Sequence, residues 1–333
     1  MRMFARLSAV LAAVSAMLVA ALPRASALDQ VSFAFAFSGT GSIANFYATE
    51  DEGLFKKVGL DVTWVTPGNV ADGVRLLASG QVQFAVVNSP DLVIARGRGV
   101  PIRSIFAVMQ HGTAGIMAPV AKNVRTLKDL EGKIVGITGL PANKAMLLQV
   151  FRANGVDPDK VQIVNVGFGT LAVVLAGKVD ALGDAITYAE PIGYNKALGK
   201  PLDDPSTITY FPFYKYGGPQ YYANEVAVRD DYLAAHPDIV RRFAQGLRDG
   251  LAWSIANPDA AAKDFLKHFP QADPDYSTAS WKAVVSLATS ADTKTHGLGW
   301  QNENTWAEIC QFLFDIKSTP AKVEPAAAYI NME

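Results

Sequence analysis

Residues 60–87, LDVTWVTPGNVADGVRLLASGQVQFAVV, contain a complete strand–helix–strand unit. Leu60–Val65 combines β-branched and aromatic residues and predicts a strand, Val70–Ala78 predicts a helix, and Phe84–Val87 predicts a second strand. Two strands joined through a helix usually run in parallel. This unit therefore places the protein in the α/β class, with helices expected on both faces of a mostly parallel sheet.

The alternation of strands and helices continues on both sides of this unit. Residues 32–37, SFAFAF, alternate aromatic and small side chains and predict an earlier strand, which a polar turn joins to a helix at 43–51. Further strands are expected at 102–109, 134–138, 161–166, 181–187 and 222–228, and further helices at 90–96, 143–154 and 171–176. Beyond residue 228 the pattern is helical, with an apolar stripe of Ile239, Phe243, Leu247, Leu251 and Ile255.

The first 27 residues have the three parts of a secretory signal peptide. Two arginines lie within residues 1–6, residues 7–22 are apolar, and Ala25-Ser26-Ala27 matches a small-residue cleavage site. We expect cleavage after Ala27, which leaves a mature chain of 306 residues (333 minus 27) in the periplasm. Because no cysteine lies near this site, we expect no lipid anchor.

A mature chain of this length predicts two domains. The repeated α/β pattern and a late return strand indicate that the chain crosses between two lobes twice, near 110–116 and 214–221, where glycines allow hinge rotation. We assign residues 28–113 and 220–333 to lobe I and residues 114–219 to lobe II. The expected ligand site is the cleft between the lobes, lined by the carboxyl ends of strands and the amino ends of helices.

Composition and motifs favour a binding protein over an enzyme. The formal net charge is −1 without a long run of one sign, which argues against a nucleic-acid or membrane-surface partner. The single cysteine, Cys310, lies among core-like residues on a late helical segment, where cysteines are usually inert. The four histidines lack metal-ligand spacing, and no phosphate loop, nucleophile elbow or acid–base pair is present. We therefore expect no catalytic residues, no metal and no cofactor.

Five short motifs resemble one family of solute-binding proteins. They are EGLFKKVGLDV (52–62), LASGQVQFAVV (77–87), LKDLEGKIVGI (127–137), LAGKVDA (175–181) and NPDAAAKDF (257–265). In this order they are similar to the periplasmic binding proteins of ABC transporters for sulfonates, nitrate and thiamine-precursor pyrimidines. The resemblance implies a type II periplasmic binding-protein fold, with two α/β lobes, a two-crossing hinge and a ligand cleft between them. It also implies a monomer that delivers a small molecule to an ABC permease in the inner membrane.

Two other classes stay open beside this one. A sensor subunit without a transport role has the same fold, and so do enzymes such as a yeast pyrimidine synthase with a cysteine-rich active-site motif. The enzyme alternative is disfavoured because this chain has only Cys310.

Lobe I offers three loops to the expected cleft. The first loop contains Phe37, Ser38 and Thr40, and its N–H and hydroxyl groups suit an anionic or carbonyl oxygen at a helix amino end. The alternative for this loop is a plain helix cap by Ser42. The other two loops contribute Asn69 and the polar pair Asn88 and Ser89, and in the family the latter loop usually lines the cleft.

Lobe II contributes the ends of three strands. Leu140 and Phe168 lie in loops that join a strand to a helix. Residues 184–190 combine an aromatic ring with an acid, and in pyrimidine-binding members such a pair from this region holds the ring. We expect Tyr188 to stack on a flat ligand and Glu190 to accept a hydrogen bond from an exocyclic amine. The alternative places Glu190 at a helix amino end for the helix dipole alone.

The segment 210–222 is unusually aromatic and spans the second crossing. Most of its rings are expected to pack in the hinge, and Tyr216 is expected to face the cleft. Few basic residues occur in the expected cleft loops, which together with Glu190 and the aromatic rings favours a flat, amine-bearing heteroaromatic such as a thiamine-precursor pyrimidine. A sulfonate, nitrate or riboflavin-type ligand is the alternative, because helix amino ends alone can bind anions.

Overall fold

The computed structural model describes residues 27–35, 40–65 and 70–332. The predicted signal peptide lies outside these residues, except for Ala27. Within the described part of the chain, none of the helices is long and apolar enough to cross a lipid bilayer.

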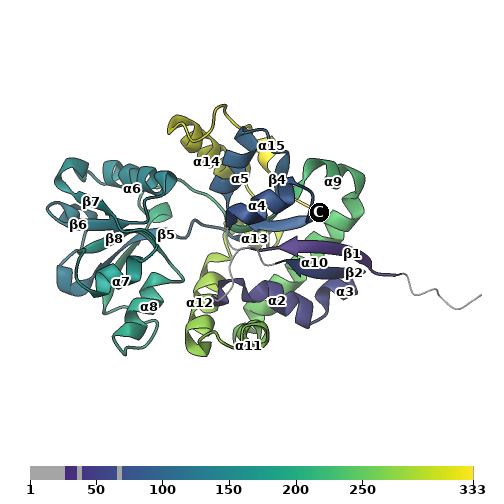
Figure 1. Ribbon diagram of the computed structural model, residues 1–333, viewed down its shortest axis with the longest axis horizontal. Helices are drawn as coiled ribbons and strands as arrows, with labels where there is room; N and C mark the ends of the chain where they lie inside the picture. Colours follow the sequence, from purple (N-terminus) through teal and green to yellow (C-terminus); the bar gives the residue numbers. More distant parts are fainter. Residues whose placement is uncertain (1–26, 36–39, 66–69, 333) are drawn as a thin grey trace, which may run out of the picture.

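Two five-stranded sheets form the framework, which confirms the α/β prediction, and Figure 1 shows them as separate bodies. The first sheet has the order β2-β1-β3-β10-β4, with β1 (Asp29–Ala34), β2 (Leu60–Val65), β3 (Phe84–Val87), β4 (Ile102–Met109) and β10 (Ala223–Arg229). The second has the order β7-β6-β8-β5-β9, with β5 (Ala114–Pro119), β6 (Ile134–Ile137), β7 (Gln162–Asn165), β8 (Ala181–Ile186) and β9 (Ile208–Pro212). We keep the proposed names lobe I and lobe II for the parts of the chain that contain these sheets.

Helices cover both sheets. Those of lobe II are α6 (Pro141–Ala153), α7 (Thr170–Leu175) and α8 (Glu190–Ala197). The early helices of lobe I are α2 (Ala44–Asp51), α3 (Leu54–Lys57), α4 (Val70–Ala78) and α5 (Ser89–Gly97). Its late helices are α9 (Asp230–Ala235), α10 (Pro237–Ala256), α11 (Pro258–His268), α12 (Pro274–Leu287), α13 (Ala291–His296), α14 (Glu303–Asp315) and α15 (Pro325–Ala328).

Each sheet contains one antiparallel strand that follows directly from a crossing. β10 runs antiparallel to both β3 and β4, and β5 runs antiparallel to both β8 and β9, while the remaining strands of each sheet share one direction. The strands β5 and β9 were not predicted from the sequence. Residues 114–116 had been assigned to the first crossing, and β9 lies at the start of the aromatic segment, where ring packing in the hinge was expected.

The first strand is also shifted from its predicted place at 32–37. β1 pairs with β2 from Asp29 opposite Leu60 to Ala34 opposite Val65, so its length is set by its partner strand. The strand therefore begins three residues before its predicted start, and the last two residues of the predicted strand, 36 and 37, lie outside the described residues.

The core of lobe I is built from aromatic rings between the sheet and α10. Phe84 of β3 stacks on Phe243 of α10 with ring centroids 3.8 Å apart. Phe243, Leu247 and Leu251 of the predicted apolar stripe are fully buried. Gly250 on α10 allows a close approach to α2, because a Cβ atom there would lie 1.8 Å from Oγ1 of Thr49.

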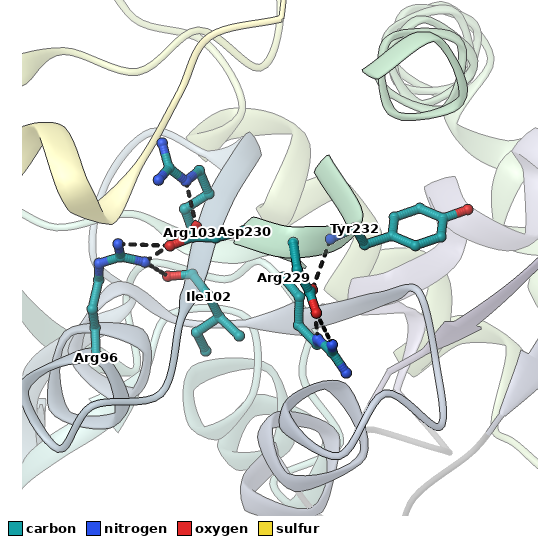
Figure 2. A network of polar contacts seen from close by, with 7 residues as sticks. Arg96, Ile102, Arg103, Arg229, Asp230 and Tyr232 are labelled. Carbon is teal, nitrogen blue, oxygen red and sulfur yellow. Dashed lines mark hydrogen bonds and ion pairs between the residues drawn. The ribbon is translucent and has the colours of Figure 1, made fainter. Parts of the chain in front are cut away.

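A group of charged residues fastens the amino end of β4 to the end of β10. Nε of Arg103 lies 2.6 Å from Oδ1 of Asp230, and Nη2 of Arg96 lies 2.9 Å from Oδ2. Figure 2 shows both guanidinium groups directed at this carboxylate, which comes from the first turn of α9. Burial alone would raise the pKa of Asp230, but the hydrogen bonds from Arg103 and Arg96 outweigh it and lower the pKa below its usual value. The carboxylate therefore links α5, β4 and α9 at the edge of the sheet.

Candidate functional site

The end of β8 in lobe II is held against α12 of lobe I. Oγ of Ser280 donates to the carbonyl oxygen of Tyr188 at 2.5 Å, and the hydroxyl of Tyr276 donates to the carbonyl oxygen of Ala189 at 3.3 Å. Lys196 of α8 also forms an ion pair with Asp273, the residue before α12. Figure 1 shows α8 and α12 facing each other between the two sheets. The strand end that was predicted to bind ligand is therefore a contact point between the lobes.

The side chain of Tyr188 reaches from lobe II into lobe I. Its exposed fraction is 9%, and it belongs to the buried apolar cluster formed mainly by lobe I residues. Burial raises its pKa, with smaller contributions from neighbouring ionisable groups, while a hydrogen bond with the Ser42 side chain acts in the opposite direction. Ser42 precedes α2, so the phenol hydroxyl lies near the amino end of a lobe I helix.

The loop that contains Ser42 packs closely on α12. Oγ of Ser42 lies 2.7 Å from Oγ1 of Thr40, and neither side chain makes a capping hydrogen bond to the helix backbone, so the simple helix-cap interpretation of Ser42 is wrong. Gly41 permits this packing, because a Cβ atom there would lie 1.9 Å from the carbonyl oxygen of Ser277. The same helix, α12, thus positions both Tyr188 and the loop that meets its hydroxyl.

Asn88 and Ser89 have different environments although they are neighbours at the end of β3. Asn88 is half-buried, and its Oδ1 accepts a hydrogen bond from the backbone N–H of Asn224 at 3.2 Å. Ser89 is completely buried, and its hydroxyl is engaged with the backbone of Tyr222 and with Glu225. Asn88 is therefore the more accessible member of the pair, whereas Ser89 connects its loop to the second crossing.

Asn224 joins these two loops and was missed from the sequence. Its Nδ2 donates to the carbonyl oxygen of Ser42 at 3.2 Å, while its N–H contacts Asn88. Its backbone has a φ of 48°, a left-handed conformation that asparagine tolerates better than most residues. The available signal was the pair Asn224-Glu225, two polar residues inside an otherwise apolar strand pattern.

Glu190 is bound within lobe II through both carboxylate oxygens. Oε1 accepts from Oγ1 of Thr170 at 2.7 Å, and Oε2 accepts from the backbone N–H of Ile186 at 2.8 Å. These bonds connect α7, β8 and α8, so Glu190 has a structural function at the start of its helix. Each carboxylate oxygen can accept a second hydrogen bond, which keeps the carboxylate available to an amine.

Leu140 and Phe168 form an exposed apolar rim on lobe II. They follow β6 and β7, which are adjacent parallel strands, and they are 45% and 82% exposed. A phenylalanine with this exposure has little of its ring covered by the described protein. The pair is thus available to contact a ligand or the opposite lobe.

The backbone of Tyr216 lies beside the carboxyl end of α6. Its ring packs edge-on against Phe211 with centroids 5.3 Å apart, and its carbonyl oxygen accepts a hydrogen bond from Asn154, which follows the carboxyl end of α6. The candidate rim residue Leu140 precedes the opposite end of this helix, about 20 Å away for thirteen residues. In the hinge itself, Tyr214 stacks on His111 with centroids 4.5 Å apart. The ring of Tyr216 is half-buried against Phe211 of β9, so its predicted position in the cleft stays a prediction.

Three of the predicted site residues, Phe37, Ser38 and Asn69, lie outside the described residues. A groove of about 1420 Å³ lies beside the contact between α8 and α12. Its walls include Thr187 and Tyr210 of lobe II and Lys263 and Lys282 of lobe I. None of the loop residues Thr40, Asn88, Leu140 and Phe168 lines it.

Two five-stranded sheets, each with one antiparallel strand that follows a crossing between the lobes, define a type II periplasmic binding-protein fold. The family model described as NMT1/THI5 like matches residues 40–261, more than half of the chain. The chain belongs to this family.

Comparison with individual proteins agrees with this assignment. The chain is 26% identical over 289 residues to the formylaminopyrimidine-binding protein of Halalkalibacterium halodurans, covering 86% of this chain and 85% of that protein. It is 22% identical over 271 residues to a 4-amino-5-hydroxymethyl-2-methylpyrimidine phosphate synthase of Saccharomyces cerevisiae, covering 80% and 79% of the two chains. Among solved structures, the periplasmic aliphatic sulphonate binding protein of Escherichia coli has the same fold, with a TM-score of 0.68, 13% identity and coverage of 90% and 96%.

Proposed function

We propose that this protein is the exported substrate-binding component of an ABC importer and that it binds a flat, amine-bearing heteroaromatic such as a thiamine-precursor pyrimidine. The observation that carries the proposal is the position of Tyr188, whose side chain extends from lobe II into the apolar cluster of lobe I and which lies two residues before Glu190 in the chain. The ring is 9% exposed, so a ligand that stacks on it takes the place of lobe I side chains that now cover it, and the acid nearby in the chain offers an acceptor for an amine.

The remaining candidate residues suit a small, mostly uncharged ligand. Thr40 and Asn88 supply hydroxyl and amide groups from lobe I, and Leu140 and Phe168 supply apolar surface from lobe II. We extend the proposed site to Phe37, Ser38 and Asn69 on the basis of their positions after strands β1 and β2. The similarity to the formylaminopyrimidine-binding protein supports this ligand class. The permease, a monomeric state and the periplasmic location are parts of the same proposal.

The similarity to a yeast synthase raises the enzyme as the second candidate. Burial raises the pKa of Cys310 to about 12, and the side chain is completely buried on α14. Cysteine nucleophiles act as thiolates in accessible positions, so Cys310 is unsuited to that function. The lack of an accessible cysteine among the described residues favours a binding protein over an enzyme.

The proposal is tested by measuring ligand binding to the mature chain, starting at Leu28. Calorimetry with 4-amino-5-hydroxymethyl-2-methylpyrimidine and formylaminopyrimidine is compared with riboflavin, an alkanesulfonate and nitrate. We expect the pyrimidines to bind and to raise the melting temperature, since a ligand at 100 times its Kd adds about 2.7 kcal/mol to the free energy of unfolding. Tight binding of the sulfonate or nitrate, with no binding of either pyrimidine, would show that the ligand class is wrong.

A further inference from the structure

Glu225 is a completely buried carboxyl group on strand β10, which lies between β3 and β4. It lies opposite Val87 of β3 and Ala107 of β4, within the lobe I sheet. Burial is the main cause that raises its pKa to about 8, and hydrogen bonds from serine side chains offset only part of this effect. An ionised carboxylate in such a position requires a cation or several hydrogen-bond donors.

The groups that face Glu225 do not supply a positive charge. The carboxylate of Asp91 on α5 would carry the same negative charge and raises the pKa of Glu225 further. Cys310 of α14 and Tyr222 at the second crossing also interact electrostatically with Glu225. Burial raises the pKa values of both Cys310 and Tyr222 to about 12, so both are neutral below that pH. Ser104 of β4 also faces the carboxyl group, and Oε2 of Glu225 has no hydrogen-bond partner of ordinary geometry among the described residues.

The hydrogen bonds of Ser89 show which form of Glu225 fits the structure. The N–H of Tyr222 lies 2.9 Å from Oγ of Ser89, the carbonyl oxygen of Tyr222 lies 3.1 Å from it, and Oε1 of Glu225 is its third partner. A serine hydroxyl has one hydrogen and two lone pairs. If Glu225 were ionised, two acceptors would compete for that one hydrogen, and the carbonyl oxygen of Tyr222 would keep only the backbone N–H of Ser89, 3.3 Å away.

A neutral Glu225 removes this conflict. Its O–H donates to Oγ of Ser89, the Ser89 hydroxyl donates to the carbonyl oxygen of Tyr222, and the N–H of Tyr222 donates to the second lone pair of Oγ. Every donor and acceptor position of the serine hydroxyl is then used once.

We propose that Glu225, as a neutral carboxylic acid, is a positioning residue that fixes the Asn88–Ser89 turn to Tyr222 at the second crossing between the lobes. Ser89 is the first residue of α5 and Asn88 is its neighbour on the cleft side, so the proton on Glu225 sets the position of a proposed ligand contact. The link to ligand binding rests on the proposed function. Loss of this proton at alkaline pH releases the turn and lowers the affinity for ligand.

The first test compares Glu225→Gln with Glu225→Met. The glutamine amide donates to Ser89 as the neutral acid does but does not ionise, whereas methionine has no donor. We expect the affinity of the wild-type protein for 4-amino-5-hydroxymethyl-2-methylpyrimidine to fall about three- to tenfold between about pH 7 and about pH 9.5, the loss expected for one hydrogen bond. Glu225→Gln should keep the neutral-pH affinity at both pH values, and Glu225→Met should have the reduced affinity at both. Asp231→Asn, at an exposed carboxylate that pairs with Arg229, is the control and should retain the wild-type pH profile.

A second measurement does not require a ligand. Because the folded pKa of Glu225 is above its unfolded value, its contribution to stability is fully present below about pH 4.5 and is lost as the pH rises to about 8. The free energy of unfolding of the wild-type protein should therefore decrease relative to Glu225→Gln across this range. Hydrogen exchange at the Tyr222 amide should accelerate above about pH 8 in the wild-type protein more than in Glu225→Gln.

These results separate the two proposals. If no pyrimidine binds but the relative stability and the Tyr222 exchange behave as described, the proposed ligand class is wrong. The proposal that neutral Glu225 positions the Asn88–Ser89 turn is then supported. If Glu225→Gln and the wild-type protein have the same pH dependence in stability and exchange, the proposed positioning function of neutral Glu225 is overturned.

Discussion

Two substitutions of Tyr188 distinguish the contribution of its hydroxyl group from that of its ring. Tyr188→Phe removes only the hydroxyl group, which lies near the Ser42 side chain, and since Ser42 also contacts Thr40, the expected loss is at most about 0.5–1.5 kcal/mol. Tyr188→Ala also removes a ring that is 91% buried (100 minus 9) at the contact between the lobes. Loss of the stacking surface should weaken pyrimidine binding by about ten- to a hundredfold, because aromatic pairs add about 0.5–1.5 kcal/mol beyond their buried area.

The assay is calorimetric titration of each variant, with urea unfolding measured in parallel. Tyr210→Phe is a matched control, since the Tyr210 hydroxyl is also buried but bonds only within lobe II and the first crossing, to Thr187, Thr113 and Ala185. This control should lower the free energy of unfolding and leave the affinity unchanged. Unchanged affinity in Tyr188→Ala, or an equal loss in Tyr188→Phe and Tyr188→Ala, would refute the stacking argument.

Two further variants test separate parts of the structure. Glu190→Gln should weaken pyrimidine binding by about tenfold or more through loss of a charged acceptor. Thr170→Val removes only the internal donor to Oε1 of Glu190, so it should change stability but not affinity. Equal effects of the two variants in calorimetry would assign Glu190 a purely structural role. Asp230→Asn should cost about 1–2 kcal/mol in urea unfolding at neutral pH. Because the pKa of Asp230 is lowered, this contribution is present above its ordinary value of 3.8 and is lost as the pH falls through the folded pKa, so the variant and the wild-type protein should converge in acid. Asp231→Asn is the control, since its carboxylate is 62% exposed and pairs with Arg229 at the surface, and an effect as large as that of Asp230→Asn would contradict the importance of burial.

Local sequence patterns predicted those strands and helices whose bounds depend mainly on residues close together in the sequence. The segments Leu60–Val65, Phe84–Val87 and Ile102–Met109 form strands with the predicted bounds, and Val70–Ala78 forms the predicted helix. The side-chain periods of strands and helices are short-range properties, so one chain is enough to reveal them. Together with the five family motifs, these patterns determined the α/β class and the two-lobed fold.

Only the tertiary structure decided which polar groups lie together at the site. Ser280 and Tyr188 are 92 positions apart, and Ser89 and Glu225 are 136 apart, so no local pattern connects them. The strands β5 and β9, the burial of Tyr188 in lobe I and the hydrogen bond from Asn154 to the carbonyl oxygen of Tyr216 all depend on such distant contacts. Glu225 is the clearest case, because the sequence shows an acid within a strand, whereas its burial and its hydrogen bond with Ser89 arise only when β10 lies between β3 and β4.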